Sequence, residues 1–252
     1  MFGRRVIYTD EAVITAENVV DVLTKALYVH NQNKAEIDYL WSYYRGKTPI
    51  LGKTKEIRQS INYKICVNRA HEIVTFKRGY GFGEPIQYIR RGQNESLTED
   101  IDQLNGFMFD QNKQAEDSNL AEWMYVCGLG IRMALPGIDQ EEPFHIYTLD
   151  PRFSFVVRYN GLGTPAVMGV KFIVKENGAT IYSVYSKDRY YEIEDGVLKK
   201  IQAHALGEVP IFEYPANEAR LGSFEIVLSL LDAINELESN RMDDVVQFVN
   251  SF

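Results

Sequence analysis

The sequence predicts an α+β protein with a helical N-terminal part, an antiparallel β-rich middle and a long C-terminal amphipathic helix. Up to about residue 131, apolar residues recur at three- and four-residue steps, which is typical of helices. From residue 143 to 214, short runs rich in Tyr, Val, Ile and Phe alternate with turn signals. Residues 223–252 contain neither Pro nor Gly. We therefore expect a helical part over 1–142, a β-rich part over 143–220 and the final helix over 221–252.

The first part is expected to hold five helices. Asn31 to Asn33 are polar and predict a break after the first helix, and Gly46 predicts the end of the second. The glycine-rich run 79–83 predicts the end of the third. The five expected helices cover residues 15–30, 34–44, 64–78, 97–109 and 113–127.

The middle part is expected to form an antiparallel sheet or a small sandwich. Asn160-Gly161, Asn177-Gly178 and Asp195-Gly196 separate alternating apolar runs, and such dipeptides are strong short-range hairpin signals. The seven expected strands cover residues 145–149, 153–159, 167–174, 180–186, 189–193, 197–201 and 209–214.

The C-terminal helix has a polar face and an apolar face. At 100° per residue, one narrow polar stripe runs opposite a row of apolar side chains. Ser223 is a suitable N-cap, whereas Phe252 is apolar, in phase and without any C-cap signal. We expect the chain to be a fragment of a longer protein. The polar stripe comprises Glu225, Ser229, Asp232, Glu236, Ser239, Asp243, Gln247 and Asn250.

The charge is unevenly distributed along the 252 residues, whose net charge is −8. Residues 1–91 hold 15 Lys or Arg and 9 Asp or Glu, whereas residues 92–252 hold 12 and 26. An acidic chain of this kind argues against a protein that grips DNA over its whole surface. No stretch approaches the ~20 apolar residues of a membrane span, so we expect no membrane partner.

We find no catalytic, cofactor or metal-binding constellation in the sequence. The four histidines are scattered, and no Cys-x-x-Cys or Gly-x-Ser-x-Gly motif occurs. The acidic loop Asp139, Glu141 and Glu142 leaves open a metal-dependent nuclease, although a solvated loop explains it better. A helical adaptor that pairs through the last helix is a further alternative. We expect a structural protein instead of an enzyme.

Three segments, taken in order, resemble one known family. They are Tyr43-Tyr44-Arg45-Gly46-Lys47-Thr48-Pro49-Ile50, then residues 68–88 from Asn68-Arg69-Ala70-His71-Glu72 to Gly79-Tyr80-Gly81-Phe82-Gly83-Glu84-Pro85, and Val209-Pro210-Ile211-Phe212-Glu213-Tyr214-Pro215. Leu231-Asp232-Ala233 and Glu238-Ser239-Asn240 follow in the last helix. This set is similar to the portal, or head–tail connector, proteins of tailed double-stranded DNA bacteriophages, in the siphophage branch.

The resemblance implies a ring, usually a dodecamer, at one capsid vertex of the virion. Such a ring is a DNA conduit during packaging and ejection, and it docks terminase, scaffold or capsid protein and head-completion proteins. It is assembled in the cytoplasm of the bacterial host. Residues 1–220 would correspond to the wing and residues 223–252 to the first stem helix, truncated before the clip.

On this template each face of the last helix gains an expected role. Acidic side chains facing a channel would repel DNA phosphates, so that DNA passes without sequence specificity and without sticking. We expect Glu225, Asp232, Glu236 and Asp243 to line the channel, with the polar stripe left free. Apolar side chains would pack between the helices of neighbouring subunits, and we expect Leu230, Ile234, Leu237 and Val245 to do so.

Overall fold

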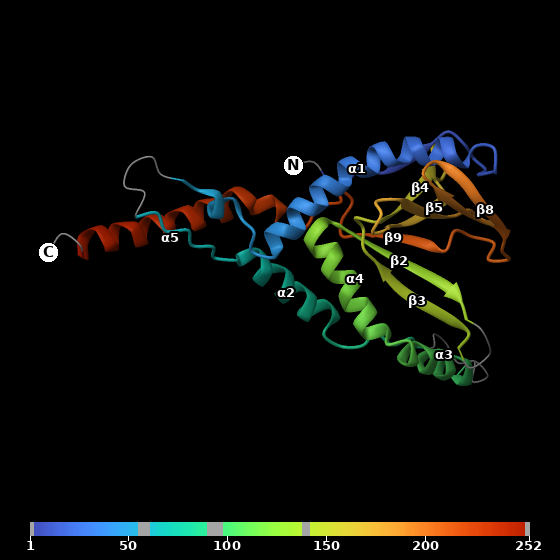
Figure 1. Ribbon diagram of the computed structural model, residues 1–252. Coiled ribbons are helices and arrows are strands. Elements are labelled where there is room, and N and C mark those ends of the chain that lie inside the picture. The colour runs from blue at the N-terminus through green and yellow to red at the C-terminus, as the bar shows by residue number, and fades with distance from the viewer. Residues whose placement is uncertain (1–2, 55–60, 90–97, 138–141, 250–252) are drawn as a thin grey trace.

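The computed structural model describes residues 3–54, 61–89, 98–137 and 142–249. A β-rich body is covered on one side by helix α1, and helix α5 projects away from that body (Figure 1). The expected α+β class is confirmed, with helices in the N-terminal part, strands in the middle and a helix at the end of the described chain.

Helix α1 runs without interruption over Val19–Tyr44, so the predicted break at Asn31 to Asn33 is wrong. Asn33 is buried in the helix, where its Oδ1 accepts from the backbone N–H of Arg5 at 2.9 Å. Its Nδ2 donates to the carbonyl oxygen of Arg5 at 2.9 Å. The polar residue that suggested a break therefore holds the N-terminal segment against the helix.

Helix α2 covers Arg69–Phe82, five residues later at its start than predicted. Asn68 caps it by accepting from the backbone N–H of His71 at 3.2 Å. Residues 62–68 are instead extended, and helix α5 satisfies alternate N–H groups of this segment. The other helical elements are the short 3₁₀ turn η1 (Pro49–Gly52) and the helices α3 (Thr98–Asp110) and α4 (Lys113–Cys127).

The strands form two sheets. A six-stranded sheet has the order β1-β4-β5-β6-β7-β8, and a three-stranded sheet has the order β3-β2-β9. All pairings are antiparallel except that of β1 with β4, which is parallel. The strands are β1 (Ile7–Thr9), β2 (Leu129–Pro136), β3 (Phe144–Leu149), β4 (Ser154–Tyr159), β5 (Ala166–Val174), β6 (Thr180–Tyr185), β7 (Arg189–Glu194), β8 (Val197–Ala203) and β9 (Ile211–Pro215).

All seven predicted strands are present, and β1 and β2 were not predicted. Strand β2 lies inside the part expected to be helical, and it follows α4 directly through Gly128, whose φ is +81°. Its first five residues are all buried, so this part lacks the alternation of a half-exposed strand. The boundaries at residues 142 and 220 remain predictions.

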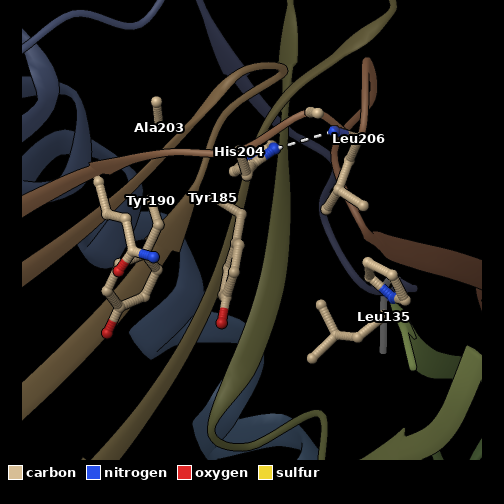
Figure 2. Close-up of a pocket in the computed structure, with 9 residues that line it drawn as sticks. Leu135, Tyr185, Tyr190, Ala203, His204 and Leu206 are labelled. Carbon is tan, nitrogen blue, oxygen red and sulfur yellow. Dashed lines mark hydrogen bonds between the residues drawn. The ribbon is translucent and has the colours of Figure 1, made fainter. Parts of the chain in front are cut away.

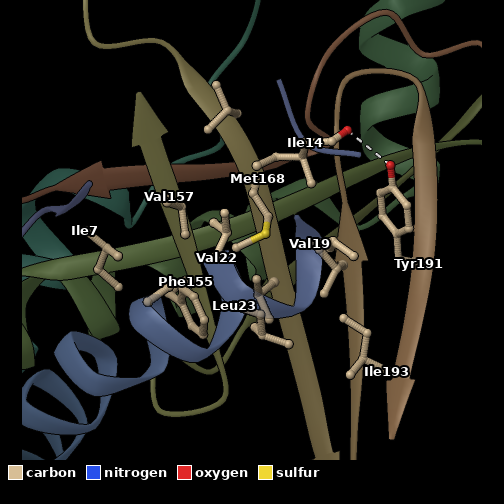
Figure 3. Packing of buried hydrophobic residues seen from close by; sticks show 14 of the residues in the cluster. Ile7, Ile14, Val19, Val22, Leu23, Phe155, Val157, Met168, Tyr191 and Ile193 are labelled. Atoms are coloured by element: carbon tan, nitrogen blue, oxygen red, sulfur yellow. Dashed lines mark hydrogen bonds between the residues drawn. The ribbon is translucent and has the colours of Figure 1, made fainter. Parts of the chain in front are cut away.

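The largest core lies between α1 and one face of the six-stranded sheet. Val19, Val22 and Leu23 of the helix pack with Met168 and Tyr191 of the sheet (Figure 3). The Tyr191 hydroxyl donates to the carbonyl oxygen of Ile14 at 3.1 Å, which closes the loop before the helix.

The opposite face of this sheet packs on the three-stranded sheet. A Cβ on Gly169 of β5 would lie 2.8 Å from the side chains of both Val209 and Ile211. Only a residue without a side chain allows the two sheets to approach this closely. The remaining core joins the second half of α1 to α2, α4 and the start of α5 through Leu40, Tyr43, Val126, Phe224 and Leu231, among others.

Within the described ranges, none of the helices combines the length and the apolarity that crossing a bilayer requires.

Candidate assembly surface on helix α5

Helix α5 covers Leu228–Val249 and follows the 3₁₀ turn η3 (Glu225–Val227). The predicted helix over 221–252 thus begins with a 3₁₀ turn, and its last three residues lie outside the described residues. Leu231 anchors the base of the helix in the core, where it lies with Tyr43 and Phe224. The Tyr43 hydroxyl donates to Oδ1 of Asp232 at 2.8 Å. Burial and this hydrogen bond raise the pKa of Tyr43 well above its usual value.

Beyond the base, the polar side of α5 binds the extended segment 62–68 of the same chain. Asn235 Oδ1 accepts from the backbone N–H of Val67 at 2.7 Å. Ser239 Oγ accepts from Ile65 N–H at 2.9 Å, and Asp243 Oδ1 accepts from Tyr63 N–H at 2.8 Å. We call this set of three hydrogen bonds the polar seam.

The geometry of the polar seam follows from two backbone periods. Four residues of helix advance about 6 Å along its axis, and two residues of extended chain advance about 6.6 Å. Side chains at 235, 239 and 243 therefore meet every second N–H of a segment that runs antiparallel to the helix. The segment is held as it would be at the edge of a sheet, with side-chain oxygens in place of carbonyls.

The polar seam is closed to solvent. Asn235, Ser239 and Asp243 are each exposed by 1% or less. The polar stripe was expected to be free, and the structure corrects this for Ser239 and Asp243, which are covered within the chain, whereas Ser229 and Glu236 of the stripe are exposed. The reason is physical: an extended segment without a neighbouring strand needs acceptors for its N–H groups, and the side chains of the polar seam supply them.

The four predicted channel-lining residues have different surroundings. Glu225 is buried at 7% exposure and accepts from Nη2 of Arg4 at 2.7 Å, and Asp243 belongs to the polar seam. Asp232 is half-buried against Tyr43. Glu236 is exposed, and its Oε1 lies 3.4 Å from Nζ of Lys53. A place in a channel stays a prediction for all four.

The apolar residues opposite the polar seam are exposed. Leu230 and Leu237 are each 58% exposed, Val245 is 55% exposed and Phe248 is 66% exposed. Ile234, also predicted to pack between helices, is half-buried. We call the exposed row, which is Leu230, Leu237, Val245 and Phe248, the outward face of α5.

One ion pair interrupts the outward face. Arg241 Nη1 donates to Glu238 Oε1 at 3.1 Å, one helical turn apart. Exposed apolar rows of this length, edged by charge, are typical of surfaces that another protein chain covers.

The predicted acidic loop gives no metal site in the described structure. Asp139 and Glu141 lie outside the described residues, and Glu142 Oε2 lies 3.9 Å from Nε2 of His145. Over the parts of the chain that are described, no three His, Cys, Asp or Glu side chains gather as metal ligands would.

A hollow of about 660 Å³ lies between the end of β2 and the segment after β8 (Figure 2). Tyr185, Tyr190, His204 and Leu135 line it. The two tyrosine rings lie 5.1 Å apart, and the Nδ1 atom of His204 accepts from Leu206 N–H at 3.4 Å. The lining is mostly apolar and brings no catalytic pair of groups together.

The exposed outward face of α5 is typical of a protein that contacts another protein chain. The chain belongs to a family of such proteins: the model of the family "phage portal protein, SPP1 Gp6-like" matches residues 23–252. The resemblance of the three motifs to siphophage portals is thereby confirmed. A search among curated proteins found no match. Membership implies a structural protein of the virion capsid that forms a ring oligomer and lets DNA pass.

Sequence reasoning missed the polar seam because its partner segment was predicted to be helical. Asn235 was left out of the polar stripe, although its four-residue spacing from Ser239 and Asp243 was visible. The signal that identifies such a seam is a run of short acceptor side chains at four-residue spacing on one helix face.

Proposed function

We propose that this chain is a portal subunit whose α5 helices pack around a central channel in a ring at one capsid vertex. The ring is a dodecamer, conducts double-stranded DNA during packaging and ejection, and docks terminase, scaffold or capsid protein and head-completion proteins. It is assembled in the cytoplasm of the bacterial host and has no catalytic activity of its own. The observation that carries the proposal is the exposed outward face of α5, on a helix whose polar side is already occupied.

The outward face supports assembly for an energetic reason. Leu230, Leu237 and Val245 are each more than half exposed, and burying such side chains gains roughly 25 cal/mol per Å² of apolar surface. In a ring, the same contact between neighbouring subunits repeats by rotation, so this surface is buried on every subunit. A single chain has no partner that could bury it. Ile234, half-buried at the margin, is the fourth packing residue of the proposal.

The assembly part of the proposal is tested by sedimentation velocity and negative-stain imaging of the chain over a range of concentrations. We expect rings for the natural chain and their loss in Leu237→Glu, because a carboxylate would have to be buried at the contact. Leu162→Glu is the matched control, since Leu162 is fully exposed in the turn between β4 and β5. Unchanged rings in Leu237→Glu would contradict the proposed packing.

We infer that the channel acids are fewer than the sequence suggested. Because Glu225 and Asp243 are buried in the chain, Glu236 is the acid most open to a channel, with Asp232 beside it. A carboxylate there repels passing phosphates and leaves DNA no deep well in which to bind.

Retention of double-stranded DNA by assembled rings tests this role. We expect Glu236→Gln to leave rings intact and to increase DNA retention, most strongly at low salt. Glu176→Gln, at an exposed position beyond β5, should change neither property. Equal retention by both variants would remove Glu236 from the channel wall and leave ring assembly standing.

A further inference from the structure

Helix α2 presents a second exposed apolar row on the same chain. Phe76 and Tyr80 are 74% and 89% exposed, and their rings lie 6.4 Å apart at an interplanar angle of 15°. On the other side of the helix, Ala70 and Val74 are fully buried. The two aromatic rings therefore point away from the core, and we call them the aromatic pair of α2.

We propose that the aromatic pair of α2 receives the outward face of α5 from a neighbouring copy of this chain. The inference rests on the proposed function, and it specifies which two surfaces meet at each subunit contact. Both rows are exposed within one chain, so the contact has to form between two copies. Two different patches that meet in this way make a head-to-tail interface, which generates a ring when its rotation closes.

Charge favours this pairing over its alternatives. Helix α5 carries five acidic residues and one Arg, whereas α2 carries three Lys or Arg and one Glu. An α5–α5 contact between copies would bring Asp244, which is exposed beside the outward face, towards a like charge. An α2–α5 contact brings Asp244 towards Lys77 and towards Arg69, which also pairs with Glu72 of its own helix; both cations are exposed on α2.

Arg241 of α5 is suited to contact the aromatic pair of α2. It lies on the side of α5 opposite the polar seam, between Leu237 and Phe248, and its side chain is 69% exposed. A guanidinium among apolar side chains suits the face of an aromatic ring, and two rings are offered by the aromatic pair. The four-residue step from Leu237 to Arg241 spans about 6 Å, close to the separation of the two rings.

Photo-crosslinking tests the pairing directly. Tyr80 is replaced by p-benzoylphenylalanine, and the variant is mixed with isotope-labelled natural chain before irradiation and mass spectrometry. We expect crosslinks from position 80 to residues 230–248 of the other chain. Tyr28, a 72% exposed tyrosine on α1, is the matched control, and the same replacement there should give no crosslink to α5. Crosslinks from position 80 only to other elements, or none between chains, would overturn the inference.

A second variant separates this inference from the proposed function. The double variant Phe76→Ser and Tyr80→Ser changes only exposed side chains, so its circular dichroism should match that of the natural chain. We expect its self-association to be at least tenfold weaker, with Tyr28→Ser unchanged. If the double variant forms rings as readily as the natural chain, α2 serves another partner, and the inference fails while the portal assignment stands. A chain that is monomeric at every concentration would also overturn it.

Discussion

Asn235 Oδ1 accepts the backbone N–H of Val67 at 2.7 Å, and this bond joins the last helix to a segment 168 residues earlier in the chain. Ser239 and Asp243 repeat the contact with Ile65 and Tyr63. The polar side of α5 is thus used inside the subunit, which fixes the rotation of the helix and leaves its apolar side outward.

The polar seam should weaken when a single acceptor is removed. Ser239→Ala leaves the partly buried N–H of Ile65 without its acceptor, which costs about 1 kcal/mol. We expect faster amide hydrogen exchange at residues 63–67 and a lower free energy of unfolding in urea. Ser229→Ala, at an exposed position of the same helix, should leave both unchanged. Equal effects of the two variants would mean that the seam contributes nothing to stability.

Acid should destabilise the protein through His30. This histidine is buried at 1% exposure, stacks on Phe155 with ring centroids 4.4 Å apart, and bonds the carbonyl oxygen of Arg152 at 3.1 Å. Burial lowers the pKa of His30 from 6.5 to about 4. As the pH falls from 6.5 towards 4, the unfolded chain binds a proton that the folded chain does not.

The free energy of unfolding should therefore fall over this pH range, by up to about 3 kcal/mol from this residue. Urea titrations at pH 7 and pH 5 measure the loss. We expect His30→Gln to lose much of this pH dependence, and His71→Gln, at an exposed position, to keep it. A natural chain equally stable at both pH values would refute the burial of a neutral His30.

The close approach of the two sheets predicts a large effect at Gly169. Gly169→Ala places a methyl group 2.8 Å from Val209 and Ile211, so the sheets must shift, at a cost of about 1–3 kcal/mol. Gly79→Ala is the control, because this exposed helical glycine has open space around it. That variant should be as stable as the natural chain or up to about 1 kcal/mol more stable. Thermal unfolding compares the two, and a neutral Gly169→Ala would contradict the packing.

The buried ion pair at the base of α5 predicts a non-additive result. The side chains of Arg4 and Glu225 are exposed by 0% and 1%, and Glu225 also accepts the N–H of Gly222. Arg4 Nε also lies 3.1 Å from Oε2 of Glu36, so Glu225→Gln removes one of its two carboxylate partners and should cost about 1–3 kcal/mol. The double change Arg4→Met and Glu225→Met should cost less than this single one. Denaturant unfolding of Arg4→Met, Glu225→Met and the double variant gives the coupling free energy between the two side chains. A double variant that costs the sum of the two single variants would show that they are not coupled.

Much of the fold was predictable because its strands alternate and its turns carry clear signals. Asp195 and Gly196 both have positive φ, at 51° and 76°, as a two-residue hairpin of the mirror-image type requires. An Asp-Gly dipeptide favours this turn by itself, so the hairpin could be predicted without knowledge of any tertiary contact.

The errors arose where distant contacts decide local structure. Asn33 suggests a helix break in the sequence, but in the structure its side chain bonds the backbone of Arg5. Residues 64–68 suggest a helix in the sequence, but in the structure α5 supplies acceptors for their N–H groups. Residues 129–133 of strand β2 are all buried, so this run has no period to distinguish it from the end of a helix. The apolar side of α5 follows from the 3.6-residue period alone, and packing of Leu230, Ile234, Leu237 and Val245 between subunits stays a prediction.

The polar seam of α5 binds a segment of its own subunit, and we propose that the outward face of α5 binds a neighbouring subunit. An electron cryomicroscopy map of the assembled chain tests it most directly. We predict that Asn235 bonds Val67 of its own subunit, while Leu230 and Leu237 contact a neighbouring subunit. A map in which Leu237 faces an open channel, or in which residues 62–68 have left α5 of their own chain, would contradict the account.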